Sequence, residues 1–335
     1  MDPAEPVGPD RPAPLPSGTH PTLGPNTVRM PRWPGPLLII GGALVAVVAL
    51  GAATAAVSGQ LGDADANLLA WIALGGAVVF SGGLVYSAVR QLRVRRILPP
   101  ERYRGPSVLI LLALVLVLAS IMTAPFGADA SALLLGDGEL TLLGAFVLLV
   151  STQVALLLVA WAFVFRPNAL AGLPSLPGHD PAGAVRAGLG WGILAWLGAT
   201  LASYAAIALL QAVGIDPEPQ AAEQALEIID PWLAVLAIVI LAPIAEETFF
   251  RGVVFNAFRR EGGRRWAYLG SSALFAVIHV SLVAVIPIFL LGLALAWVYE
   301  RTGSLLAPMA MHAVVNGVSV LLALLLRFDV IRVPV

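Results

Sequence analysis

Residues 235–258 read VLAIVILAPIAEETFFRGVVFNAF, and this stretch decides the fold class. It is long and apolar enough to cross a bilayer, since a spanning helix needs about 20 predominantly apolar residues. Yet it carries Glu246, Glu247 and Arg251. A charge at the centre of a membrane helix costs about 2.5–3.5 kcal/mol on insertion scales, so such residues face a bundle interior or a polar cavity. The stretch therefore predicts a membrane helix whose charged side chains are covered by other helices.

The composition points to the same class of protein. Of the 335 residues, 59% are hydrophobic and 12% are charged, whereas a soluble domain has about a quarter charged residues. We therefore expect an all-α, polytopic transmembrane bundle in a bilayer. The net charge of −1 gives no basic field, so no nucleic-acid partner is expected. The absence of Cys excludes disulfides, thiolate metal sites and Cys nucleophiles, and because all 19 basic residues are Arg, Lys is excluded as a catalytic base.

Apolar runs along the chain predict eight or nine spanning helices. The expected spans are 37–57, 68–89, 108–123, 140–165, 189–213, 232–258, 266–282, 283–299 and 305–326. The seventh and eighth run together around Pro287 and form either two short spans or one kinked element. Residues 1–35 are rich in Pro and lack periodicity, which predicts a disordered cytoplasmic tail. Residues 36–165 are expected to form an accessory four-helix region, and residues 186–327 the functional core.

Charges in the loops predict the orientation in the membrane. Arginines crowd the loops after the second and sixth expected spans: Arg90, Arg93, Arg95, Arg96, Arg102, Arg104, Arg259, Arg260, Arg264 and Arg265. The intervening loops are acidic. Arg-rich loops stay in the cytoplasm. The protein is therefore expected in the cell membrane with its N-terminus on the cytoplasmic side. The composition, without Lys or Cys and rich in Ala, Gly and Pro, is typical of a bacterial protein.

The two adjacent glutamates are expected to have different roles. Glu246 and Glu247 project about 100° apart on a helix. Glu247 and Arg251 are spaced i,i+4, the favourable order for an ion pair, so we interpret them as a structural pair. Glu246 then faces another direction and is free to act as a general base. The alternative is an ion-pair network that only locks helices together. Pro243, just before the pair, removes a helical hydrogen bond and is expected to admit water.

Two further polar clusters lie in the apolar segments that follow. His279 comes one turn after Phe275, and His312 and Asn316 share a helix face at i,i+4. Two donors on one buried face can stabilise an oxyanion. The alternatives are a core histidine with satisfied hydrogen bonds and an interhelical polar contact.

Other hydrolase chemistries are less well matched. Glu246, His279 and His312 would be the ligands if the protein were a zinc enzyme, but no H-E-x-x-H motif is present. Ser271 and Ser272 precede His279, but no G-x-S-x-G motif accompanies them. We therefore expect no cofactor.

The three motifs occur in a recognisable order. The segments Glu246-Glu247-Thr248-Phe249-Phe250-Arg251, Phe275-Ala276-Val277-Ile278-His279 and His312-Ala313-Val314-Val315-Asn316 together resemble the CPBP family of intramembrane proteases. This family includes the CAAX prenyl endopeptidases and the bacterial Abi-type immunity proteins, and the resemblance covers residues 235–320. It implies a conical cavity open to the cytoplasmic leaflet, and the absence of a recognisable zinc motif in this chain favours a metal-independent form of the chemistry.

The resemblance also implies residue roles. Glu246 and His279 would activate water, His312 and Asn316 would stabilise the oxyanion, and Glu247 would pair with Arg251. The expected function is an intramembrane endopeptidase that cleaves a membrane-associated protein or peptide, and a prenylated CAAX-like protein is one candidate substrate. The partners are then that substrate and the lipid bilayer. The alternatives are a non-proteolytic immunity or scaffold protein and an ion-coupled transporter, which also uses buried carboxylates and histidines.

Overall fold

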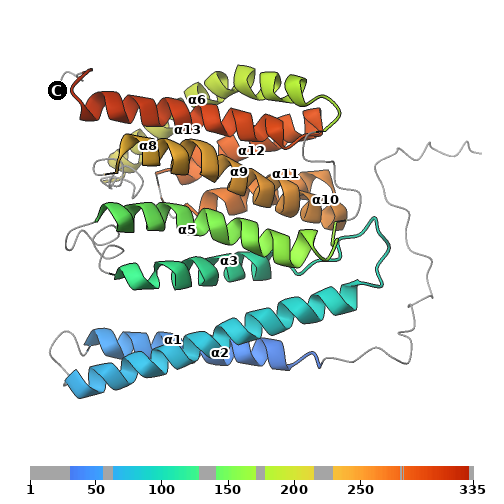
Figure 1. Cartoon of the computed structure of the whole chain (residues 1–335), viewed down its shortest axis with the longest axis vertical. Helices are drawn as coiled ribbons and strands as arrows, with labels where there is room; N and C mark the ends of the chain where they lie inside the picture. Colours follow the sequence, from blue (N-terminus) through green and yellow to red (C-terminus); the bar gives the residue numbers. More distant parts are fainter. Residues whose placement is uncertain are drawn as a thin grey trace, which may run out of the picture. The chain divides into compact units, whose positions relative to one another are not determined.

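The computed structural model describes residues 31–55, 63–127, 141–170, 178–214, 229–279, 281 and 283–331, and all regular structure in these ranges is helical (Figure 1). The helices are α1 (Pro34–Ala55), α2 (Asp63–Arg95), α3 (Val108–Thr123), η2 (Ala124–Phe126), α5 (Leu142–Ala160), η3 (Trp161–Phe165), α6 (Pro181–Ala212), α8 (Pro231–Ala234), η4 (Val235–Leu241), α9 (Ala242–Glu247), η5 (Thr248–Phe255), α10 (Asn256–Gly262), α11 (Arg264–Val277), α12 (Val285–Thr302) and α13 (Leu306–Arg327). The predicted all-α class is confirmed. The predicted tail lies almost wholly outside the described residues.

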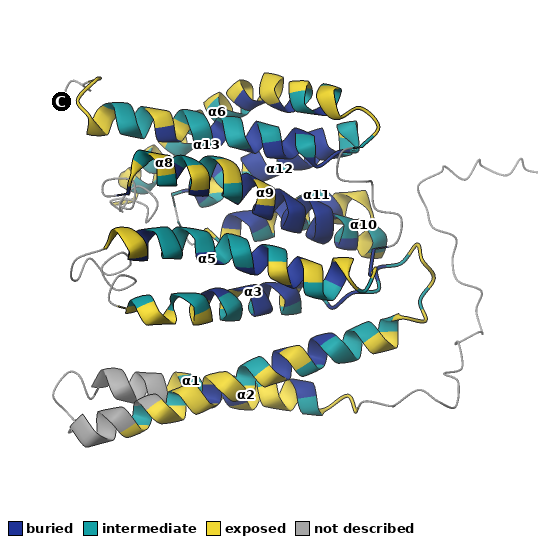
Figure 2. Ribbon diagram, in the orientation of Figure 1, coloured by how far each residue is buried: buried dark blue, intermediate teal, exposed yellow. Residues whose placement is uncertain are grey.

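The protein is a multi-pass membrane protein. In the part of the chain that the structure describes, seven helices are long and apolar enough to cross a bilayer. Large apolar side chains face outward on several of them, as Trp232 and Leu201 do at 80% and 71% exposure. Figure 2 shows exposed positions along these helices, and large apolar residues occupy many of the exposed positions. An outward apolar surface of this kind is what contact with lipid tails requires.

Of the other helices, α1 has 22 mostly apolar residues. Helix α11 has 14 residues and is too short to meet these criteria. At the α-helical rise, α11 is roughly 21 Å long, less than the hydrocarbon thickness of about 30 Å. The expected seventh and eighth spans are therefore two separate helices, α11 and α12, and Pro287 lies in the first turn of α12.

The charged stretch forms one continuous helical segment, from α8 through α10, that contains two π-helical parts, η4 and η5. Pro243 has no N–H to donate back along the helix. In the π register of η4, the carbonyl of Ile238 would accept from residue 243, five positions later. Instead, Asn316 Nδ2 of α13 donates to the Ile238 carbonyl oxygen at 2.9 Å. The proline thus creates an acceptor that a neighbouring helix satisfies.

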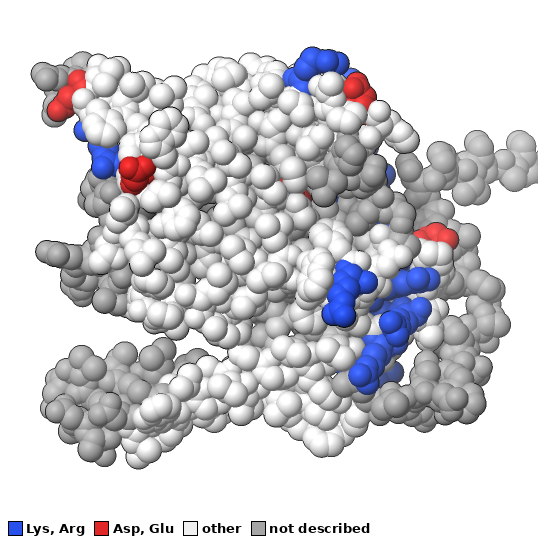
Figure 3. Space-filling view, in the orientation of Figure 1, with Lys and Arg blue, Asp and Glu red and all other residues white. Residues whose placement is uncertain are grey.

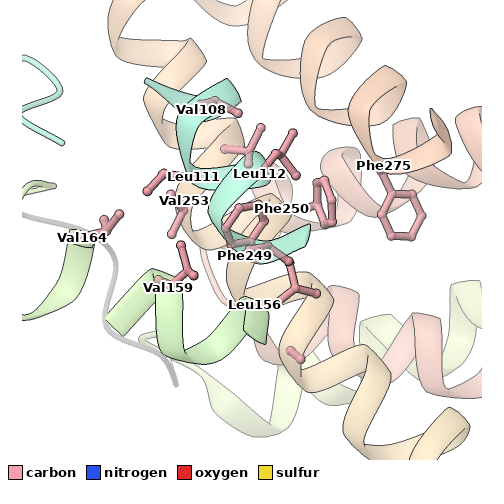
Figure 4. Close-up of a cluster of buried hydrophobic side chains, with 14 of the residues drawn as sticks. Val108, Leu111, Leu112, Leu156, Val159, Val164, Phe249, Phe250, Val253 and Phe275 are labelled. Atoms are coloured by element: carbon pink, nitrogen blue, oxygen red, sulfur yellow. The ribbon is translucent and has the colours of Figure 1, made fainter. Parts of the chain in front are cut away.

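The segment α8–α10 is covered by helices from both halves of the chain. Phe249, Phe250 and Val253 pack with Leu111 of α3 and Leu156 of α5 in one buried apolar cluster (Figure 4). The same cluster includes residues of α11, α12 and α13. Helices α3 and α5 therefore help to bury the charged stretch, although the predicted accessory region includes them.

Helices α1 and α2 pack against each other through glycines. A Cβ atom on Gly42 would lie 2.3 Å from the backbone nitrogen of Phe80, and one on Gly76 would lie 2.6 Å from that of Ala46. Small residues at such crossings let two membrane helices approach closely. Any larger residue at either glycine would force α1 and α2 apart.

Candidate active site

A cavity of about 500 Å³ lies among α5, α6, η4, α9, α11, α12 and α13. Its walls are mostly apolar, and seven polar residues line it: Gln153, Ser203, Glu246, His279, His312, Asn316 and Ser319. The structure thus places all four residues expected to be catalytic at one cavity, although they come from three separate segments of the chain. Sites of this kind, apolar with a few convergent polar groups, are typical of ligand and substrate binding.

The pair Glu247 and Arg251 lies behind the cavity wall. Both side chains are fully buried, and Arg251 Nη1 donates to Glu247 Oε1 at 2.9 Å. Arg251 Nη2 donates to the carbonyl oxygen of Gly292 on α12 at 2.9 Å. The guanidinium also lies over the ring of Phe275, 4.5 Å from its centroid. The arginine therefore ties together η5, α11 and α12 while it neutralises Glu247.

Glu246 faces the cavity. It is 8% exposed, and its Oε2 has no hydrogen-bond partner among the described residues. The nearest cationic candidate is His312, whose Nε2 lies 3.9 Å from Oε2. Because Glu247 points to Arg251 instead, the two adjacent carboxylates have distinct surroundings. Glu246 is consequently the carboxylate available to water or substrate.

The contacts of the two cavity histidines allow their tautomers to be assigned. His312 Nδ1 lies 3.0 Å from Glu247 Oε1, and His279 Nδ1 lies 2.7 Å from the carbonyl oxygen of Phe275. An ionised carboxylate and a carbonyl can only accept, so each Nδ1 carries the proton and donates. In a neutral ring, Nε2 is then the acceptor. Each histidine is therefore held through Nδ1 and has Nε2 for chemistry.

Phe275 explains the spacing of the second motif. Its ring packs edge-to-face with His279, at a centroid distance of 5.0 Å, and with His312, at 5.8 Å. Its carbonyl fixes His279, which lies in the turn just after α11 ends at Val277. One aromatic residue thus positions both histidines and covers the guanidinium of Arg251.

Asn316 makes a hydrogen bond to the protein backbone in addition to the oxyanion role expected from the sequence. Its Nδ2 donates to the Ile238 carbonyl described above, so one of its two amide hydrogens is engaged. The second hydrogen has no partner among the described residues and remains available at the cavity wall.

Three cavity residues were missed by sequence reasoning: Gln153 of α5, Ser203 of α6 and Ser319 of α13. The hydroxyl of Ser203 donates to the carbonyl of Ala199, and that of Ser319 donates to the carbonyl of Val315. Ser319 also accepts a hydrogen bond from Trp196 Nε1. Gln153 Oε1 is buried without a hydrogen-bond partner among the residues described. A lone amide within an apolar span was the available signal for Gln153.

A metal ligand set does not form in the described residues. No three His, Asp or Glu side chains there are placed to hold one ion. Glu246, His279 and His312, the set considered for a zinc enzyme, are also not placed to hold one ion. The nitrogens at Nδ1 of both histidines are engaged by protein acceptors, which leaves only the Nε2 atoms for any ligand.

We predict that Asn316→Leu lowers the free energy of unfolding by about 1–3 kcal/mol, because it leaves the buried Ile238 carbonyl without its donor. Gln153→Leu is the matched control, since it also replaces a cavity amide but removes no side-chain hydrogen bond between described residues. Its effect should stay within about 0.5 kcal/mol. Reversible unfolding in mixed micelles measures both. Equal losses would contradict a structural role for Asn316.

The comparison with protein families matches this region of the chain. Residues 228–318 match the family described as type II CAAX prenyl endopeptidase Rce1-like. All three motifs lie within the matched segment, so the resemblance inferred from them is confirmed. Gln153 and Ser203 lie outside that segment.

Similar proteins occur in bacteria. A 24.3 kDa protein of Escherichia coli without an assigned function is 40% identical over 88 residues, which are 25% of this chain and 41% of that protein. A Bacillus subtilis protein named "Putative membrane peptidase YdiL" is 29% identical over 112 residues, 33% of this chain and 46% of its own. The UPF0177 protein YxdF of Lactococcus lactis is 30% identical over 78 residues, 23% of this chain and 42% of its own. The chain thus spans less than half of the length of each relative, and no solved structure matches it significantly.

Proposed function

We propose that this protein is an intramembrane endopeptidase in which Glu246 and His279 activate a water molecule. The observation that carries the proposal is the carboxylate of Glu246, which lines the cavity with an unpartnered Oε2 while its neighbour Glu247 is neutralised by Arg251. The family match and the name of the Bacillus subtilis relative support a membrane protease in general. The substrate class is a membrane-associated protein or peptide, and the family's description suggests a prenylated, CAAX-like one.

The proposed reaction is a general-base hydrolysis. Glu246 takes a proton from water, and the resulting hydroxide attacks the carbonyl carbon of the scissile peptide bond. His279, held as the Nδ1–H tautomer, accepts a hydrogen bond from the same water at Nε2. Collapse of the tetrahedral intermediate breaks the C–N bond. The protonated Glu246 then returns its proton to the leaving amine, so that the acid and base roles alternate.

The oxyanion would be stabilised by His312 and Asn316. With Glu246 and Glu247 ionised and Arg251 charged, a protonated His312 brings the sum of these four charges to zero. It also gives Nε2 a hydrogen to donate, while Nδ1 stays bonded to Glu247. Asn316 would add its free amide hydrogen. In this arrangement Glu247 positions His312, and Arg251 positions Glu247.

The proposed topology places the N-terminus in the cytoplasm. It rests on the arginines that follow α2 and α10, because Arg-rich loops are retained on the cytoplasmic side.

The test compares protein termini in membranes that contain the wild type or Glu246→Gln at matched abundance, by mass spectrometry. Glu246→Gln should remain folded, because Oε2 has no protein hydrogen bond to lose among the described residues. New termini that appear only with the wild type are expected, and they would name the substrates. Identical termini would contradict the proposal and favour an immunity factor, a scaffold or an ion-coupled transporter.

Two further samples sharpen the comparison. His179→Ala, which changes an exposed histidine just before α6, should give the wild-type termini. Treatment with a zinc chelator should leave them unchanged. Their loss on chelation and recovery with zinc would instead indicate a metalloprotease.

A further inference from the structure

A second cavity, of about 550 Å³, lies where α2 ends and where η3 is followed by residues 167–169. Its polar lining consists of Arg93, Arg96, Arg104 and Asn168. The rest of the lining is apolar: Val89, Leu92, Pro167 and Ala169. This cavity shares no residue with the candidate active site, and the inference drawn from it is independent of the proposed function.

The charge of this cavity is uncompensated. No carboxylate lines it, and Arg93 and Arg96 make no hydrogen bond or ion pair with any residue that the structure describes. Glu261, an acidic residue of the neighbouring α10, is engaged by Arg95 at 3.0 Å. Figure 3 shows arginines gathered at this end of the molecule, with few acidic side chains among them. The guanidinium groups are therefore available to an anionic ligand.

The backbone around the cavity is held in place. Arg104 donates through its backbone N–H to the carbonyl of Ala169 at 2.9 Å, and through Nε to the carbonyl of Leu98 at 2.8 Å. The first bond joins the loop after α2 to the segment after η3, and the second lies within that loop. Asn168 adopts a positive φ of 51°, and its side-chain amide makes no hydrogen bond with the described residues. The site thus offers a fixed wall with three guanidinium groups and one amide.

The position corresponds to the lipid head groups. The C-terminal ends of α2 and η3 meet here, where apolar spans give way to polar loops. On η3, Trp161 is 55% exposed and Arg166 lies over its ring at 5.7 Å, a pairing suited to a membrane–water interface. The Arg-rich loop predicts that this end faces the cytoplasm, where the leaflet carries anionic lipids.

We infer that this cavity binds the phosphate of an anionic phospholipid head group. Guanidinium groups present paired N–H donors that match phosphate oxygens, and basic pockets between membrane helices suit anionic head groups. The apolar half of the lining, which includes Val89, Leu92 and Pro167, would contact the glycerol and the first acyl carbons. A free phosphate ion would use only the polar half, so a lipid fits the whole cavity better.

The test measures binding of phosphatidylglycerol to the full-length protein in detergent by native mass spectrometry, with phosphatidylcholine as the zwitterionic comparison. Arg93→Gln/Arg96→Gln should weaken phosphatidylglycerol binding by at least about tenfold, since each arginine near the surface contributes about a fivefold factor. Arg104 is left unchanged because its Nε holds the loop. The control is Arg186→Gln/Arg301→Gln, which makes the same charge change at two exposed arginines outside the cavity.

The control should stay within about twofold of the wild type. Equal losses of lipid affinity in the cavity and control variants would mean that general surface charge causes the effect, and they would overturn the inference. Unchanged affinity in both variants would also overturn it. Displacement of the lipid by inorganic phosphate at equal affinity would assign the site to a soluble phosphate and also overturn it. Arg93→Lys/Arg96→Lys keeps the charge without the paired donors. This lysine variant should bind phosphatidylglycerol with an affinity between those of the wild type and the glutamine variant. It still tests the inference if the glutamine variant does not fold.

Discussion

An Arg251→Leu variant is expected to lose about 3–5 kcal/mol of unfolding free energy, because it leaves the fully buried carboxylate of Glu247 without its counter-charge. The loss includes the bond from Arg251 Nη2 to the Gly292 carbonyl and the contact with the ring of Phe275. Three helical segments meet at this guanidinium, so the change should affect the whole bundle and not one helix alone.

Unfolding in mixed micelles, followed by tryptophan fluorescence, measures this loss. The matched control is Arg264→Leu, whose partner is Glu300 at 2.8 Å but whose side chain is 68% exposed. Water and salt screen an exposed ion pair, so the stability of this variant should be almost unaffected. The double variant Glu247→Leu/Arg251→Leu removes both charges and should recover part of the stability. If Arg251→Leu were as mild as Arg264→Leu, the central role of the buried pair would be refuted.

Much of this arrangement was predictable because the lipid environment restricts where charges can lie. The exposed surface of a spanning helix cannot carry an ionised group at low cost, so Glu246, Glu247 and Arg251 had to face inward. Within one helix, spacing then determines direction, which separates Glu246 from the i,i+4 pair of Glu247 and Arg251. The all-α class follows from the same restriction, since a helix satisfies its own backbone in lipid.

Helix ends were predicted less well, because apolar runs report the thickness of the lipid and not the length of the helix. The expected fifth span begins at residue 189, but α6 begins at Pro181. Asp180 caps it by accepting from the Gly183 N–H, with proline in the first turn, so the helix extends beyond the apolar run. Conversely, the expected seventh span continues to residue 282, whereas α11 ends at Val277.

Contacts between distant helices could not be predicted from spacing. The bond from Asn316 to the Ile238 carbonyl depends on the π register of η4 and on Pro243, and neither periodicity nor motif spacing specifies that register. Gln153 reaches the cavity because α5 packs beside α9, a relation that a single sequence does not encode locally. The sequence therefore predicted which way side chains point on one helix, but it did not predict which side chains of different helices contact each other.

The largest effects on activity are expected at Glu246 and His279, once a substrate is identified. Glu246→Gln and His279→Ala should each lower kcat/KM by about 10²–10⁴-fold, the range of a positioned acid or base. Both residues line the same cavity, and we propose that they act on the same water. Once one of the two residues is replaced, replacing the other should lower kcat/KM little further. The double variant is therefore expected to have the kcat/KM of the less active single variant.

The kinetic comparison separates this mechanism from a structural role for either residue. Exposed residues of the same types supply the controls, and Glu101→Gln and His179→Ala should keep wild-type kcat/KM. Multiplied losses in the double variant would mean that Glu246 and His279 act on separate steps, and full activity in either single variant would remove that residue from the mechanism. Unchanged unfolding in both single variants would attribute the loss to chemistry, because neither residue contributes to the buried ion pair that holds the helices together.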